Sequence, residues 1–256
     1  MSNIYKAFEN KKAFIAFLTA GDPDYDTSLQ NFRAVIEAGA DLIEVGIPFS
    51  DPIAEGPVIQ EADIRALGAG MTTDKVFQLV KDIRKDYDIP IVFMTYANPV
   101  YHYGTEEFFK KASEAGADGI IIPDCPFEER HEFDDTAAKY GMDFISMIAP
   151  TSEDRIKMIA SQAKGFIYVV SSLGVTGVRS EITTDINTIM KLIKEATDTP
   201  AAIGFGISTP EQAKKMSQTA DGVIVGSAMV RIVAEYGKGA PEKLKEYIKG
   251  MVEAID

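Results

Sequence analysis

Short apolar segments alternate with longer amphipathic segments along most of the chain. The apolar segments have the length and the β-branched or aromatic content of buried strands. They lie at residues 13–20, 41–47, 91–96, 118–122, 142–148, 166–171, 201–206 and 222–227. Helical spacing of apolar residues occurs at 24–37, 59–67, 73–87, 105–115, 128–140, 186–195, 209–218, 228–236 and 241–254, and Ser152 is the expected N-cap of one more helix. Strands that alternate with helices predict a parallel sheet.

Internal similarity indicates which parallel fold to expect. The segment EAGADLIEVGIP at 37–48 recurs as EAGADGIIIPD at 114–124 and, more loosely, as TADGVIVGS at 219–227. The segment DIPIVFMTY at 88–96 likewise resembles DTPAAIGFG at 198–206. A repeated βα unit favours a closed ring over a doubly wound sheet. We therefore predict an α/β fold, a single (β/α)8 TIM barrel with extra helices, with residues 1–256 forming one domain.

Composition narrows the classes of function. The net charge is −13, and no basic face is visible for nucleic acid or a membrane surface. The apolar run 13–20 follows two lysines like a short signal segment, but it continues into a helical pattern, as a first strand does. No apolar stretch approaches the ~20 residues of a membrane span. The single cysteine, Cys125, excludes an internal disulfide and suits the reducing cytoplasm.

The segment EVGIPFSDPIAEGP at 44–57 is the strongest candidate for chemistry. Pro48 and Pro52 end the preceding strand and shape a loop, because proline cannot donate to a sheet ladder. Glu44 lies within the strand, and Glu55 lies in the loop that follows. A lone carboxylate at a strand end is as readily a rim salt bridge as a catalytic group. Two carboxylates that converge on one cleft favour acid/base chemistry.

Small residues follow the last strands, where barrels of this class bind phosphate. The loops are SSLGVTG at 171–177, GFGIS at 204–208 and VGSA at 225–228, and the last two contain no lysine or arginine. Backbone amides would therefore hold the anion, which favours a small phosphorylated metabolite. A glycine-rich loop at 171–180 is either an ordinary surface loop or a lid, and its place beside the expected site favours a lid.

Other candidate side chains give weaker signals. Five apolar or aromatic residues lie near predicted strand ends, where they either fill the core or form a subsite that binds a ring of the substrate. They are Phe17, Met94, Tyr96, Tyr168 and Phe205. His102 and His131 are isolated and are expected to face solvent, and no residue spacing predicts a metal site. Cys125 has no nearby histidine in sequence and is expected to be structural.

The motifs EVGIPFSDPIAEGPVIQ, YANPV at 96–100, SSLGVTG and GFGIS, in this order, resemble those of the tryptophan synthase alpha subunit family. The resemblance implies a barrel that cleaves indole-3-glycerol phosphate to indole and glyceraldehyde 3-phosphate without a metal or cofactor of its own. It implies catalytic roles for Glu44, Glu55 and Tyr168. Glu55 stands where many relatives carry aspartate, and Ser172 stands where some carry arginine.

The resemblance also implies binding residues and a partner. The implied phosphate ligands are Gly177, Gly206, Gly226 and Ser227, and the implied indole pocket is Phe17, Met94 and Phe205. Thr176 is the implied lid residue. The implied partner is the pyridoxal-phosphate beta subunit, in a cytoplasmic alpha2beta2 heterotetramer, with contacts at Pro48, Asp51 and Asn98.

Two alternatives remain open on the sequence. The Glu55 substitution leaves room for a chain that mainly docks and activates the beta subunit and has weak lyase activity of its own. Another barrel enzyme of phosphorylated metabolites is a further alternative, but such enzymes typically use a catalytic lysine, and no lysine lies at a predicted strand end.

Overall fold

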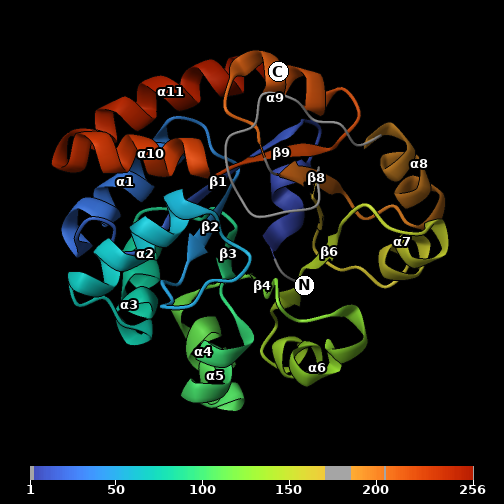
Figure 1. The fold of residues 1–256 in the computed structure, drawn as a ribbon, viewed down its shortest axis with the longest axis horizontal. Helices are drawn as coiled ribbons and strands as arrows, with labels where there is room; N and C mark the ends of the chain where they lie inside the picture. The colour runs from blue at the N-terminus through green and yellow to red at the C-terminus, as the bar shows by residue number, and fades with distance from the viewer. Residues whose placement is uncertain (1–2, 171–185, 205, 256) are drawn as a thin grey trace.

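The computed structural model describes residues 3–170, 186–204 and 206–255. Parallel strands form a ring in the order β5-β4-β3-β2-β1-β9-β8-β7-β6, and helices surround them (Figure 1). The strands are β1 (Ala13–Thr19), β2 (Leu42–Gly46), β3 (Ile91–Met94), β4 (Gly119–Ile121), β5 (Asp143–Phe144), β6 (Ser146–Ile148), β7 (Ile167–Val170), β8 (Ala201–Gly204) and β9 (Gly222–Val225). The predicted barrel class is confirmed.

The segment 142–148, expected to be one strand, is two. β5 pairs with β4, and β6 pairs with β7. Between them, the Ile145 N–H still donates to the Ile120 carbonyl at 2.9 Å. This segment therefore changes neighbours within a few residues and brings the two ends of the strand order together. The eight predicted segments are all present, and the ninth strand comes from this change of neighbour.

The helices cover the outside of the ring. They are α1 (Tyr25–Glu37), α2 (Pro57–Gly68), α3 (Thr73–Arg84), α4 (Ala97–Tyr103), α5 (Thr105–Ala115), α6 (His131–Lys139), α7 (Glu153–Ala160), α8 (Ile186–Ala196), α9 (Pro210–Ser217), α10 (Ser227–Tyr236) and α11 (Ala240–Ile255), with 3-10 helices η1 (Asn3–Phe8), η2 (Phe127–Glu129) and η3 (Gly237–Gly239). None of the helices in the described residues is long and apolar enough to cross a membrane.

Local sequence explains most of the helix ends. Ser152 is the N-cap of α7, as predicted, and its hydroxyl accepts the Arg155 N–H at 3.4 Å. Helix α2 begins earlier than predicted because Pro57 fits the first helical position. The helix α4 was not predicted. It is only seven residues long, and its Ala97 N–H donates at 3.0 Å to Asp124 from the loop after β4, a contact that no local pattern shows.

Strand register places the candidate side chains on one face of the sheet, because residues that pair in parallel strands point to the same side. Phe17 of β1 pairs with Glu44 of β2. Tyr168 reaches the same face through the pairs Tyr168–Ala202, Ala202–Gly222 and Gly222–Ala13. Glu44 acts on the pKa of Tyr168 although three strands, β1, β9 and β8, separate them. The shared face is therefore the interior of the barrel.

An ion pair ties the loop after β1 to helix α2. Arg65 donates from Nε and Nη2 to the two carboxylate oxygens of Asp22, both at 2.8 Å, and Asp22 is 2% exposed. In an Arg65→Ala variant this carboxylate stays buried without its cation. We expect the free energy of unfolding, measured by urea denaturation, to fall by about 3 kcal/mol.

The Lys6→Ala variant is the control, because Lys6 and Asp88 form an exposed ion pair at 3.1 Å. Its expected loss is below about 1 kcal/mol. Equal losses in the two variants would show that burial of Asp22 is not what makes its ion pair important.

Candidate functional site

Glu44 is a fully buried carboxyl in the barrel interior. It is 0% exposed, and neither of its carboxylate oxygens has a hydrogen-bond partner among the described residues. Burial, and then the charge of Glu55, raise its pKa from 4.5 to about 8. At neutral pH the carboxyl therefore holds a proton that it can release and take back, as a general acid/base requires.

Glu55 reaches the interior from the segment between β2 and α2, residues 47–56, here called the β2–α2 loop. Its side chain is buried, and its charge raises the pKa of both Glu44 and Tyr168. Its carbonyl accepts the Gln60 side-chain amide at 2.8 Å, and its N–H donates to the Pro52 carbonyl at 3.1 Å. The structure therefore places a strand carboxyl and a loop carboxyl, both buried, near enough for the charge of one to act on the other.

Tyr168 enters the interior from β7. Burial and the charges of Glu44 and Glu55 raise the pKa of its hydroxyl well above 10, so it stays protonated. Its ring lies against β8: a Cβ on Gly204 would lie 2.4 Å from the Tyr168 hydroxyl oxygen. Glycine at 204 therefore leaves room for the tyrosine beside the two carboxyls.

This close approach gives a testable expectation. In a Gly204→Ala variant the added methyl group displaces Tyr168, and we expect a loss of about 1–3 kcal/mol in the free energy of unfolding. The control is Gly250→Ala in helix α11, where nothing beyond the chain neighbours and the nearby backbone of the helix itself lies within 4 Å of the added methyl. That variant is expected to gain up to about 1 kcal/mol from helix propensity. Thermal unfolding measures both, and equal stability of the two variants would contradict the close approach.

Phe17 and Met94 form an apolar wall beside Glu44. The Phe17 ring lies between two strands: a Cβ on Gly46 would lie 2.8 Å from it, and one on Gly226 would lie 3.1 Å from it. Met94 pairs with Gly46, so it points to the same side. Both side chains are almost wholly buried. The third residue expected in this wall, Phe205, lies outside the described residues.

The expected phosphate ligands follow the last two strands. Gly206 lies after β8 with φ at +81°, a conformation that favours glycine. Gly226 is the N-cap of α10, and Ser227 is its first residue. The start of a helix presents backbone N–H groups and a positive dipole to an anion. The carboxyl ends of parallel strands meet at one end of the barrel, so this helix start and the β2–α2 loop share that end. Three residues singled out in the sequence, Gly177, Thr176 and Ser172, lie outside the described part of the chain.

The three expected partner contacts differ in exposure. Asp51 and Asn98 are exposed, and Ser50 donates to the Asp51 carboxylate at 2.5 Å. Pro48 is buried in the isolated chain. Ile53, between Asp51 and Glu55 in the β2–α2 loop, is 75% exposed, an unusual state for a large apolar side chain.

Two side chains near the site were not given a role from the sequence. Tyr96, expected only as ring or core, accepts the Ala54 N–H at 3.1 Å through its hydroxyl oxygen and so holds the β2–α2 loop. Asp63 of helix α2 is 6% exposed, and burial and the charge of Glu55 raise its pKa to about 8. Its spacing from Ile59 and Ala66 places it on the apolar face of the helix, a signal that sequence reading can find.

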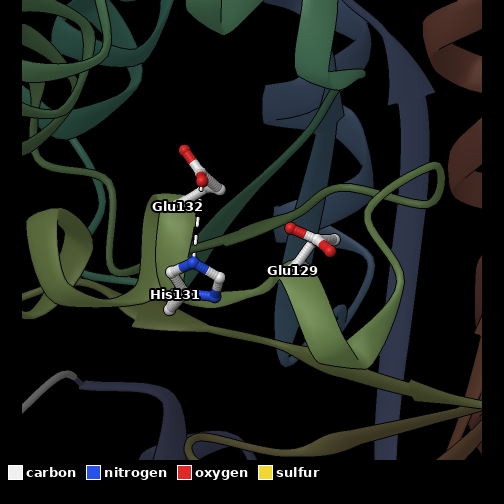
Figure 2. A group of neighbouring side chains, drawn as sticks. All are labelled: Glu129, His131 and Glu132. Atoms are coloured by element: carbon white, nitrogen blue, oxygen red, sulfur yellow. Dashed lines mark ion pairs between the residues drawn. The ribbon is translucent and has the colours of Figure 1, made fainter.

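A separate group of exposed side chains lies close together, an arrangement that exposed acidic groups often have without a metal ion. Glu129, His131 and Glu132 lie on η2 and α6, with ligand atoms within 4.8 Å of one another (Figure 2). All three are exposed, and the His131 ring lies 3.6 Å from Glu132. His102 is exposed too, as predicted for both histidines. Burial raises the pKa of Cys125 to about 11, in keeping with a structural cysteine.

Comparison with known proteins identifies the family. The family model described as tryptophan synthase alpha chain matches residues 5–255. The tryptophan synthase alpha chain of Lactiplantibacillus plantarum is 51% identical, over 100% of this chain and 97% of the relative, and that of Lacticaseibacillus casei is 48% identical, over 100% and 96%.

Solved structures agree with this match. Tryptophan synthase subunit alpha from Legionella pneumophila has a TM-score of 0.91 at 36% identity, over 100% of this chain and 99% of that chain. A chain of the tryptophan synthase complex from Pyrococcus furiosus has a TM-score of 0.87 at 38% identity, over 95% and 99%. This chain belongs to the tryptophan synthase alpha chain family.

Proposed function

We propose that this chain cleaves indole-3-glycerol phosphate to indole and glyceraldehyde 3-phosphate, the lyase half-reaction of tryptophan synthase. The observation that carries the proposal is Glu44, a fully buried carboxyl with a pKa raised to about 8, beside Glu55 and Tyr168 in a barrel of this family. The site also has the apolar wall and the helix start that a molecule with a ring at one end and a phosphate at the other requires.

Glu44 is the proposed acid and base of a retro-aldol cleavage. It delivers a proton to the indole ring carbon that carries the side chain, and it takes the proton of the hydroxyl group next to the ring. The carbon–carbon bond then breaks, its electron pair returns to the ring, and the hydroxyl carbon becomes the aldehyde. A pKa near neutrality suits both transfers. Glu55 accepts a hydrogen bond from the indole N–H, and Tyr168 positions the substrate beside both carboxyls.

Binding energy at the two ends of the substrate orients it for this step. Phe17, Met94 and Phe205 contact the indole ring. The phosphate accepts hydrogen bonds from Gly177, Gly206, Gly226 and Ser227, and Thr176 closes the site. The start of α10 at Ser227 and the positive φ of Gly206 support the phosphate assignment.

The proposed partner is the beta subunit, in an alpha2beta2 heterotetramer in the cytoplasm. Pyridoxal phosphate belongs to that subunit, and this chain, a single domain, carries no cofactor. Asp51, Asn98 and Pro48 form the proposed contact. The exposure of Ile53 supports it, since an exposed apolar side chain beside exposed polar ones suits an interface.

The alternative function is a docking and activating subunit with weak chemistry of its own. Its motivation is Glu55 in place of the usual aspartate. The burial of Glu55 and its effect on the pKa of Glu44 support the lyase instead, because the longer side chain still acts on the catalytic carboxyl.

The test is indole release from indole-3-glycerol phosphate by the purified chain, with and without a beta subunit. Release by the chain alone that rises when the partner is added supports the lyase. Activation of the beta subunit without any cleavage would favour the docking subunit.

A further inference from the structure

The segment 206–209, between β8 and α9, carries one of the proposed phosphate ligands, Gly206. Strand β8 pairs with β9 at Ala202 and Gly222. The same register, continued along the two strands, sets Gly206 opposite Gly226, the N-cap of α10. The two glycines therefore follow neighbouring strands at the same level, at the end of the barrel where the phosphate is proposed to bind.

Contacts within the segment and helix α9 fix its local shape. The Gln212 side-chain oxygen accepts the Ser208 N–H at 2.8 Å, the Ser208 hydroxyl at 3.1 Å and the Thr209 N–H at 3.2 Å. The Thr209 hydroxyl in turn accepts the Gln212 N–H, which completes a capping box. Ile207 is 4% exposed and joins the segment to the core, but an apolar contact has no direction. These contacts leave the orientation of the segment relative to the barrel to a further group.

Tyr247 of helix α11 supplies a directional contact from a distant part of the chain. Its hydroxyl donates to the Ser208 carbonyl at 2.9 Å, across 39 residues of sequence. Helix α11 packs along α9 (Figure 1), and the Tyr247 ring packs against the core. Burial raises the pKa of the hydroxyl above 10, so it stays a donor at neutral pH. The N–H, the hydroxyl and the carbonyl of Ser208 are therefore all held.

We propose that Tyr247 is a positioning residue for phosphate binding: its hydroxyl holds the Ser208 carbonyl and so keeps Gly206 opposite Gly226, where both backbones bind the phosphate of the substrate. Tyr247 acts through Ser208 and does not itself contact the substrate. The part that the phosphate plays in this inference rests on the function proposed above.

Two tyrosine variants test the inference. Tyr247→Phe removes the hydroxyl and keeps the ring. Tyr25→Phe is the matched control, because the Tyr25 hydroxyl also lies in a half-buried place and donates to Asp82 at 2.7 Å, between helices α1 and α3. Three readouts are measured: kcat and KM for indole release, the dissociation constants of glycerol 3-phosphate and of indole, and the unfolding temperature. Glycerol 3-phosphate represents the phosphate end of the substrate, and indole represents the ring end.

Tyr247→Phe is expected to raise KM and the dissociation constant of glycerol 3-phosphate by about three- to tenfold, the effect of one lost hydrogen bond. We expect kcat and the dissociation constant of indole to stay within about twofold of the parent, because the phosphate is bound equally before and during the reaction. Tyr25→Phe is expected to lower the unfolding temperature at least as much, since its lost partner is a carboxylate, and to leave kcat, KM and both dissociation constants unchanged.

An unchanged dissociation constant of glycerol 3-phosphate in Tyr247→Phe would overturn the inference. Equal weakening of glycerol 3-phosphate and indole, or equal weakening in Tyr25→Phe, would also overturn it, because each would show a general loosening of the fold. If the parent chain binds glycerol 3-phosphate but releases no indole, the proposed function is wrong, and the binding comparison alone decides the role of Tyr247. A parent chain that binds no glycerol 3-phosphate refutes that role.

Discussion

The Glu44→Gln variant is expected to release indole about 10²- to 10⁴-fold more slowly than the parent chain, the range by which general acid/base groups contribute. Glutamine has nearly the size of glutamate, so it fills the same buried place between Phe17 and Val92 in the register of the barrel. It cannot exchange a proton near neutral pH. The loss is therefore expected in kcat, with KM changed far less. Steady-state kinetics, with and without the beta subunit, measure it.

The control for this experiment is Glu114→Gln, the same chemical change at an exposed position of helix α5. It is expected to leave both kcat and KM at the values of the parent. Undiminished activity in Glu44→Gln would mean that another group transfers the proton, and Glu55 would then be the first candidate.

The stability of the chain relative to Glu44→Gln is expected to fall as pH rises. Glu44 has the ordinary glutamate pKa of 4.5 in the unfolded chain and a pKa of about 8 in the folded chain. Below pH 4.5 both states hold the proton and the folded state bears no penalty. Between these values the unfolded chain releases the proton while the folded chain keeps it, so folding loses about 1.4 kcal/mol per pH unit. Above pH 8 the loss is complete.

Urea denaturation at pH 5 and pH 8 measures this effect. The difference in unfolding free energy between Glu44→Gln and the parent is expected to shift by about 4 kcal/mol in favour of the variant. Any cost of the buried amide is independent of pH and cancels in this comparison. The Glu114→Gln variant is expected to show no such shift. A difference that stays constant with pH would show that the folded chain does not hold Glu44 in its protonated form.

Prediction from sequence succeeded where structure follows from local pattern. The eight apolar segments and the helix after Ser152 are present because strand length, helical spacing and N-cap chemistry are properties of neighbouring residues. It failed where contacts between residues far apart in the sequence determine the structure. The segment 142–148 is split because its halves pair with different strands, β4 and β7. Helix α4 depends on a hydrogen bond from Ala97 to Asp124.

The residues of the candidate site likewise divide into those that local sequence reveals and those that only the folded structure reveals. Glu44 and Glu55 were recognised because prolines mark the end of a strand and a shaped loop. Asp63 was missed as a member of the site, although its place on an apolar helix face is visible in the sequence. What makes it notable is the set of acidic groups around it, and that set exists only when three segments meet.

By itself, the sequence determined the repeated βα units, the parallel barrel and the positions of the candidate carboxyls Glu44 and Glu55, since each depends on short-range spacing. Tertiary structure alone decided the protonation of the site and the fit of its side chains. The pKa of Glu44 near 8 arises from complete burial and from a charge that comes from another segment. Gly204 leaves room for Tyr168 because the folded barrel brings the two neighbouring strands to within contact distance. Burial and close approach are properties of the assembled barrel, and no stretch of sequence contains them alone.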